Sequence, residues 1–133
     1  MALNVTTANT VTMSDSTQNI NIQQSKTVTD TTAGLNCVVQ SYSIALGATS
    51  YIEIAKGDIA SIQNIFIVVT HKPTVYAGLG LQLSASDPTT AAPLMTINDT
   101  FVLANCSFAN KIWIRNANTD AVTILVILSG TNA

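Results

Sequence analysis

Lys111, Trp113 and Arg115 form the one polar-aromatic group in this sequence, and they alternate with Ile112 and Ile114. Alternation places the three side chains on one face of a strand and the two isoleucines on the other. Tryptophan and arginine are favoured anchors in binding sites, so this face could stack on a sugar or hold a partner protein. In the alternative that we prefer, Trp113 belongs to the core and the two cations flank it.

Tyr76 is a second candidate of the same kind, because it shares its strand parity with Gly78 and Gly80. The rest of the chemical inventory is thin. His71 is the only histidine and precedes Lys72 in an expected turn, so we assign it a structural role. The carboxylates lie mostly in turns without a close pair, and neither a phosphate-binding loop nor a nucleophile elbow is present. The sequence therefore predicts no catalytic residue, no metal site and no cofactor.

Cys37 and Cys106 are the only two cysteines, and neither has the spacing of a zinc ligand pair. Free cysteine behaves as a small hydrophobic residue, so we expect two reduced, buried thiols. A disulfide is the alternative, and it requires an oxidising compartment. The sequence begins without a basic segment followed by an apolar one, which predicts a protein made and kept in a cytoplasm.

Charge is scarce: 9% of the residues are charged and 47% are hydrophobic, against about 25% charged in an average soluble domain. The five basic residues are scattered among seven acidic ones, for a net charge of -2. No basic stripe follows from this distribution, so we expect no direct contact with nucleic acid. Apolar runs stay far below the roughly twenty residues needed to span a bilayer, so we expect no membrane insertion.

Beyond Gly34 the hydrophobic period is two, which is typical of strands. The clearest strand has Val75, Ala77, Leu79, Leu81 and Leu83 on one face. A parity switch after Val39 predicts a bulge near Gln40, and one helical turn is predicted at 58–62. The other predicted strands are 35–39, 42–46, 51–55, 65–70, 100–104, 111–115 and 122–128.

This spacing of strands and polar turns predicts an all-β fold, a single antiparallel β-sandwich of the jelly-roll type at 34–133. Residues 1–33 are mostly Thr, Asn, Ser and Gln and bury too little apolar surface to fold alone. They form either an extended N-terminal arm or edge strands at 19–24 and 26–30. Residues 84–95 make the longest irregular stretch, and so the best candidate for a functional loop.

Two predicted strands are apolar on both faces, at 65–69 and 122–128. A sandwich buries only one face of each sheet, so the second apolar face needs a cover. We expect that cover to be a neighbouring subunit, with Phe66, Val68, Leu125 and Ile127 at the interface. In the alternative, the arm or a long loop folds over them.

The stretches 101–105, 111–116 and 121–128 resemble the closing strands of small β-sandwich virion proteins from tailed bacteriophages. The resemblance lies in pattern and composition and covers roughly the last seventy residues. It implies a non-enzymatic accessory protein of the virion, a capsid decoration or fibre-base subunit. Such proteins are usually homotrimers with an N-terminal arm that docks on a capsid or tail protein.

Two other functions remain open on the sequence. A carbohydrate-binding module would use Trp113 and Tyr76 to stack on a glycan. A secreted pilus-type subunit would complement a neighbour's sheet with its arm, and this function requires a disulfide between Cys37 and Cys106.

Overall fold

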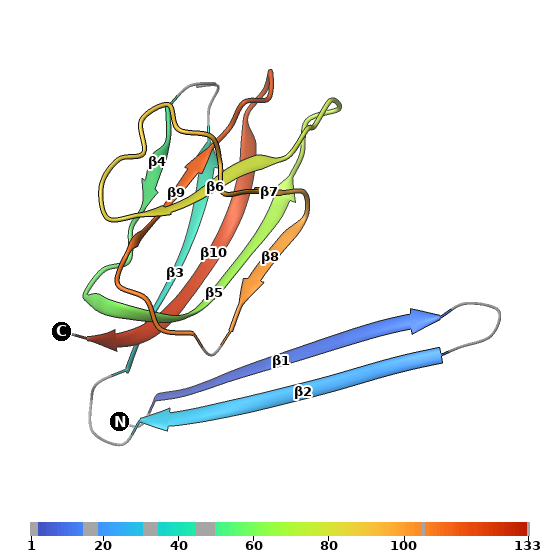
Figure 1. Ribbon diagram of the computed structural model, residues 1–133, viewed down its shortest axis with the longest axis vertical. Helices are drawn as coiled ribbons and strands as arrows, with labels where there is room; N and C mark the ends of the chain where they lie inside the picture. Colours follow the sequence, from blue (N-terminus) through green and yellow to red (C-terminus); the bar gives the residue numbers. More distant parts are fainter. Residues whose placement is uncertain (1–2, 15–18, 31–34, 45–49, 105, 133) are drawn as a thin grey trace. The chain divides into compact units, whose positions relative to one another are not determined.

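The computed structural model describes residues 3–14, 19–30, 35–44, 50–104 and 106–132. The chain divides into two compact units, Met1–Leu35 and Asn36–Ala133. Figure 1 shows strands in both units and no helix among the described residues. The all-β class predicted from the period of two is therefore confirmed.

The first unit is a β-hairpin made of β1 (Leu3–Ser14) and β2 (Asn19–Asp30). The two strands pair antiparallel in a continuous register from Leu3 opposite Asp30 to Ser14 opposite Asn19. Threonine and valine recur along both strands and isoleucine along β2, and these β-branched residues favour extended backbone. The segment expected as an arm or as edge strands thus pairs with itself and forms a two-stranded sheet of its own.

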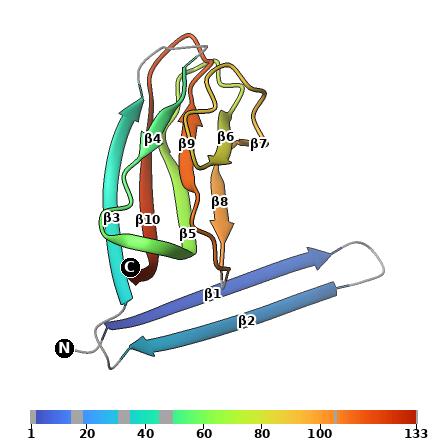
Figure 2. The same ribbon diagram turned by 60° about the vertical axis from the view of Figure 1, so that its left-hand side comes forward.

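The second unit is an antiparallel β-sandwich of two four-stranded sheets, as predicted (Figure 2). Sheet I has the order β3 (Leu35–Ile44), β10 (Val122–Asn132), β5 (Ile59–His71) and β8 (Thr100–Leu103). Sheet II has the order β4 (Ile52–Ile54), β9 (Lys111–Arg115), β6 (Leu79–Ser84) and β7 (Met95–Ile97). Eight strands in two sheets is also the strand count of a jelly roll, which stays a prediction.

The core lies between the two sheets and is built from alternate residues of their strands. Sheet I contributes residues of β10 and β5, and sheet II contributes residues of β9 and β6. Each side chain buried in this way stabilises the fold by about 1.5–3 kcal/mol. The central members are each at most 1% exposed: Ile65, Ile67, Ile124, Val126, Leu128, Leu79, Leu81, Ile112 and Ile114.

The strand predicted from Val75 to Leu83 is right for its second half and wrong for its first. Leu79 and Leu81 are fully buried in β6, but Val75 is 72% exposed and lies before the strand. Gly78 has a φ of 92°, a left-handed conformation that ends the extended backbone. The alternation of apolar residues in the sequence therefore begins at Val75, before strand β6 begins at Leu79.

The bulge predicted near Gln40 is not needed. Val38 and Tyr42 pack against the core with buried Ile44, whereas Val39 is 61% exposed. The inward residues of β3 thus keep a single parity, and Val39 points away from the core. The side chains of the other residues that suggested the switch, Leu35, Cys37 and Leu46, lie outside the described residues.

The helical turn predicted at 58–62 is also wrong, because β5 begins at Ile59. Ile59 and Ile62 are both buried although they are three residues apart. Their pairing with β10 is irregular, with register shifts on either side of Gly130 and Thr131. A bulged strand turns residues of unequal spacing to the same side, so it imitates a helical period.

Candidate functional site

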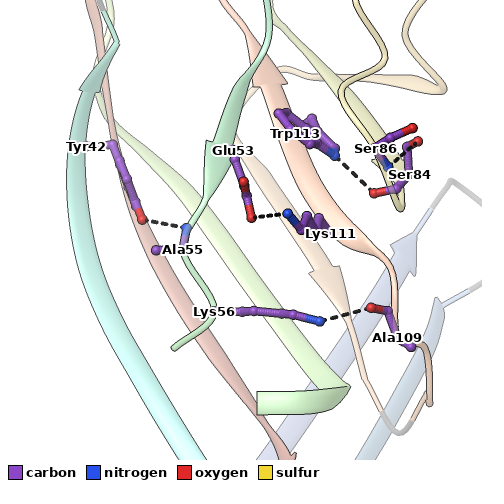
Figure 3. A network of polar contacts seen from close by, with 9 residues as sticks. All are labelled: Tyr42, Glu53, Ala55, Lys56, Ser84, Ser86, Ala109, Lys111 and Trp113. Carbon is purple, nitrogen blue, oxygen red and sulfur yellow. Dashed lines mark hydrogen bonds and ion pairs between the residues drawn. The ribbon is translucent and has the colours of Figure 1, made fainter. Parts of the chain in front are cut away.

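The predicted group of Lys111, Trp113 and Arg115 lies on the outer face of sheet II, opposite the buried Ile112 and Ile114. Figure 3 shows Lys111 and Trp113. Each of its cations has a partner within the fold. The Lys111 ammonium lies 3.2 Å from a Glu53 carboxylate oxygen across the β4–β9 pair. The Arg115 guanidinium lies 5.0 Å from the centre of the Tyr51 ring, which is cation–π distance. These contacts hold the two cations in place on the outer face of sheet II.

Trp113 is only 7% exposed, although it lies on the outer side of its sheet. Its indole Nε1 donates a hydrogen bond to the Ser84 carbonyl oxygen at 3.0 Å, as Figure 3 shows. A buried tryptophan usually needs such a partner for its one polar atom. The one polar atom of the ring therefore has a hydrogen-bond partner. Trp113 behaves as a packed structural residue, the role that we prefer from the sequence.

Residues 85–94, which we call the covering loop, are the part of the chain that closes this face. They leave the end of β6 and return to β7, drawn from yellow to orange in Figure 1. Tyr51 donates from its hydroxyl to the Ala91 carbonyl at 2.9 Å, and Gln82 donates from Nε2 to the Ala92 carbonyl at 2.9 Å. The sequence marked this stretch as the best functional loop, and these contacts give it a structural role.

Gly80 shows how closely the covering loop approaches the sheet. A Cβ at this position would lie 3.1 Å from the Cβ of Pro93. The register places Gly80 opposite Arg115 on β9 and opposite Thr96 on β7. The glycine thus makes room for the loop on the outer face, a close approach of two backbones that a side chain would hinder.

Tyr76, the second aromatic candidate, is not brought together with Trp113. It packs against the hydrophobic core, and its hydroxyl donates to the Ile97 carbonyl at 2.9 Å. Burial, with a contribution from the Asp99 carboxylate, raises the pKa of Tyr76 above its ordinary value. Tyr76 is bonded to Ile97 and Trp113 to Ser84, so the described contacts do not join the two aromatic residues in one stacking surface for a glycan.

His71 and Cys106 are the remaining residues with reactive side chains that the sequence singled out. His71 is exposed at the end of β5. Cys106 is a half-buried free thiol whose Sγ lies 3.0 Å from the Gln63 carbonyl oxygen, and burial raises its pKa. Within the part of the chain that the structure describes, no three His, Cys, Asp or Glu side chains form a cluster that could hold a metal ion.

The four residues predicted for a subunit interface do lie together, on the outer face of sheet I. Leu125 pairs with Val68, and Ile127 pairs with Phe66 on the neighbouring strand. Phe66 also pairs with Val102 of β8, which the sequence analysis missed. Phe66 is 37% exposed and Val102 is 44% exposed. These five residues, which we call the apolar patch, run across three adjacent strands.

No charged residue of the Asp, Glu, Lys or Arg type occurs in any of the four strands of sheet I. The described outward residues beside the apolar patch carry no charge: Ser41, Ser43 and Thr123 are small and polar, and Val39 of β3 is apolar and 61% exposed. In a strand with one solvated face, charged or strongly polar residues on that face normally alternate with apolar residues that point inward. The composition of sheet I instead suits a face that another surface covers.

The signal for Val102 was present in the sequence. Residues 101–103 are Phe, Val and Leu, so this strand too is apolar on both parities. Its shortness hid the pattern, because four residues give only two positions on each face. The same rule that selected Phe66 and Leu125 would have selected Val102.

Comparison with known protein families, with curated proteins and with solved structures gives no match. No helix among the described residues is long and apolar enough to cross a bilayer. Neither alternative function is supported by a contact among the described residues. Trp113, on which a glycan would stack, is only 7% exposed, and Cys106, which the pilus-type subunit would need in a disulfide, is a free thiol.

Proposed function

We propose that this protein is a non-enzymatic structural subunit that self-associates through the outer face of sheet I. The observation that carries the proposal is the apolar patch on a sheet whose strands hold no Asp, Glu, Lys or Arg. An exposed apolar patch without nearby charge favours association, since little repulsion opposes contact.

The size of the face suits such a contact. With about 4.8 Å between strands and about 3.3 Å per residue, the four strands of sheet I offer about 600 Å² of flat area. A stable interface buries about 800 Å² on each partner. Projecting side chains make the accessible area larger than the flat area, and the flanking loops add to it. The area of the face thus comes close to this value. Phe66 and Leu125 would become buried on association and would supply most of its free energy.

The role we propose for the assembly is that of an accessory protein of a tailed-bacteriophage virion, a capsid decoration or fibre-base subunit. Support comes from the antiparallel sandwich and from the resemblance of its closing strands to such proteins. The N-terminal unit, which forms its own sheet, would dock on a capsid or tail protein. The expected assembly is a homotrimer, made in the host cytoplasm and located in the virion.

Mass measurement in solution tests the self-association. At low micromolar concentration, multi-angle light scattering should give the mass of three chains for the wild type and of one chain for Leu125→Lys. Thr90→Lys adds the same charge at an exposed position of the covering loop and should keep the wild-type mass. Unchanged Trp113 fluorescence in both variants would show that the sandwich is folded. A wild-type monomer at every concentration contradicts the proposal.

The virion role has a separate test. Mass spectrometry of washed particles from a phage that encodes the chain should detect it in constant ratio to the major capsid or tail protein. Detection in the cell lysate alone, with none on the particles, contradicts the role and leaves the self-association standing.

A further inference from the structure

Arg115 is the only arginine of the chain, and it is the last residue of β9. On the outer face of sheet II, its guanidinium lies 5.0 Å from the centre of the Tyr51 ring. Its register partner on the other neighbouring strand is Gly80, which has no side chain. A guanidinium is planar and charged, and it presents five N–H donors in a fixed fork. These donors need acceptors from the fold, from water or from a ligand.

The fold supplies no such acceptor to Arg115, although it supplies one to each other basic residue of the sandwich. Within the described residues, no oxygen accepts a hydrogen bond from the guanidinium, and no carboxylate lies within ion-pair distance of it. The three lysines of this unit each have an oxygen partner: Lys72 with Asp99, Lys111 with Glu53, and Lys56 with the Ala109 carbonyl. Arg115 is therefore the cation of the sandwich whose hydrogen-bonding capacity is unused.

The unused donors of Arg115 are accessible, although the residue is half-buried. No fully buried side-chain nitrogen or oxygen in the described part of the chain lacks a hydrogen-bond partner. Since the guanidinium nitrogens have no acceptor, they are in contact with solvent. The Tyr51 ring beside them is 6% exposed, and its hydroxyl donates to the Ala91 carbonyl. The guanidinium thus lies against a fixed ring, so binding a ligand would cost it little further freedom.

We propose that Arg115 binds a carboxylate of a partner protein, the side chain of an aspartate or a glutamate. The two oxygens of a carboxylate match the fork of a guanidinium, and the pair forms two parallel N–H···O hydrogen bonds. A lysine at this position would offer a point charge without that match. The cation–π contact with Tyr51 leaves the donors at the edge of the guanidinium plane available for such a pair.

Charge favours a carboxylate over a phosphate group at this position. Lys111, the other cation on the outer face of β9, is already paired with Glu53. One uncompensated positive charge therefore faces the ligand, and a carboxylate carries one negative charge. A phosphate group carries close to two at pH 7, so it would need a second cation or further donors beside Arg115.

This site lies on the sheet opposite to the one proposed for self-association, so the two contacts use separate surfaces of the sandwich. It rests on the proposed function only in the choice of partner. In the virion, the carboxylate would belong to the capsid or tail protein on which the chain docks. Binding of a carboxylate by Arg115 does not depend on that choice, and it is tested first on the isolated protein.

Because the chain has a single arginine, its side-chain Nε–H gives one signal in nitrogen-edited NMR spectra. Sodium acetate is the probe, and it replaces sodium chloride so that the ionic strength stays constant. We expect the Arg115 signal to shift and to saturate, with half-saturation at about 0.1 M acetate, as suits one exposed ion pair. A signal that does not move, or that moves linearly over the whole range, overturns the proposal.

Sodium phosphate at pH 7 distinguishes the two anions in the same experiment. Half-saturation at a phosphate concentration no lower than that of acetate supports a carboxylate site. Half-saturation at a clearly lower phosphate concentration overturns the choice of carboxylate.

Two substitutions test the fork of donors, with the backbone amides around residue 115 as reporters. Arg115→Lys keeps the charge, and we expect it to abolish saturation over the same range of acetate concentration. Lys72→Gln removes a charge elsewhere on the sandwich and should leave the acetate titration unchanged. Unchanged Trp113 fluorescence in both variants would show that the sandwich is folded. An Arg115→Lys titration equal to that of the wild type means that a bare charge suffices, and it overturns the paired hydrogen bonds.

Washed virions test the choice of partner. Loss of a charged hydrogen bond at a docking contact lowers affinity by about tenfold, so Arg115→Gln should reduce the amount of the chain on the particles. Lys72→Gln, which removes the same charge, should not. Equal amounts for Arg115→Gln and the wild type overturn the capsid or tail protein as the source of the carboxylate. If the wild type itself is absent from the particles, the proposed virion role fails, and the acetate titration still decides whether Arg115 binds a carboxylate.

Discussion

The outer faces of the two sheets differ, although their inner faces share one core. On sheet II, the covering loop is hydrogen-bonded to Tyr51 and Gln82, Lys111 is paired with Glu53, and Arg115 lies over the Tyr51 ring. On sheet I, Phe66 and Val102 are more than a third exposed, and the strands hold no Asp, Glu, Lys or Arg. Among the described residues, the outer face of sheet II is contacted by a loop of its own chain, and the outer face of sheet I keeps exposed apolar side chains.

This difference shows that a large apolar residue at an outward strand position can be packed by its own chain or left exposed. Composition alone does not distinguish these two cases. Trp113 and Phe66 both lie on outward strand positions. The indole has a hydrogen-bond partner and is 7% exposed, whereas the phenyl ring is 37% exposed. What distinguishes them is the chain segment that returns over one sheet.

The largest effect is expected from truncating the two aromatic residues. Trp113→Ala should lower the free energy of unfolding by about 3–5 kcal/mol, as for a core residue. Phe66→Ala should lower it by only about 1 kcal/mol, the loss of its cross-strand contacts. Denaturant unfolding followed by circular dichroism, at a concentration where the protein is monomeric, measures both. Equal losses in the two variants would remove the distinction between the faces.

Gly80→Val should displace the covering loop. Its Cβ would meet the ring of Pro93, and overpacking of this kind costs about 1–3 kcal/mol. We expect a red shift of Trp113 emission, because water gains access to the indole. Thr96→Val changes the cross-strand neighbour on β7 and should leave the emission unchanged. An unshifted spectrum in Gly80→Val would mean that the loop does not shield the ring.

Sequence reasoning predicted the sandwich and the apolar patch because both follow from alternation along single strands. Lys111–Arg115 was found with its observed bounds, and four of the five patch residues were identified. What could not be predicted depends on contacts between distant segments. The hydrogen bond of Trp113 is made to Ser84, at the end of another strand, and the false turn at 58–62 results from irregular pairing with β10.

Tyr51→Phe should loosen the covering loop without removing the ring beneath Arg115. The substitution deletes the hydrogen bond to the Ala91 carbonyl, a loss of about 1 kcal/mol. Hydrogen exchange should become faster at the amides of residues 89–94 and stay unchanged at those of β5. Equal acceleration in both places would indicate a general loss of stability, and no acceleration would mean that this bond does not hold the loop.

Tyr76 adds a third aromatic environment, against the core, and it has the smallest expected effect. Burial and the Asp99 carboxylate raise its pKa in the folded state. Above pH about 10, the ordinary tyrosine pKa, the unfolded chain loses this proton first, so the free energy of unfolding falls as pH rises. Between pH 9 and 11, Tyr76→Phe should make this decline shallower, by an amount on the order of the binding of one proton. Denaturant unfolding of both proteins at a series of pH values measures it. Identical pH profiles for the wild type and Tyr76→Phe would show that folding does not raise the pKa of this hydroxyl, and would contradict the inferred effect of its burial and of Asp99.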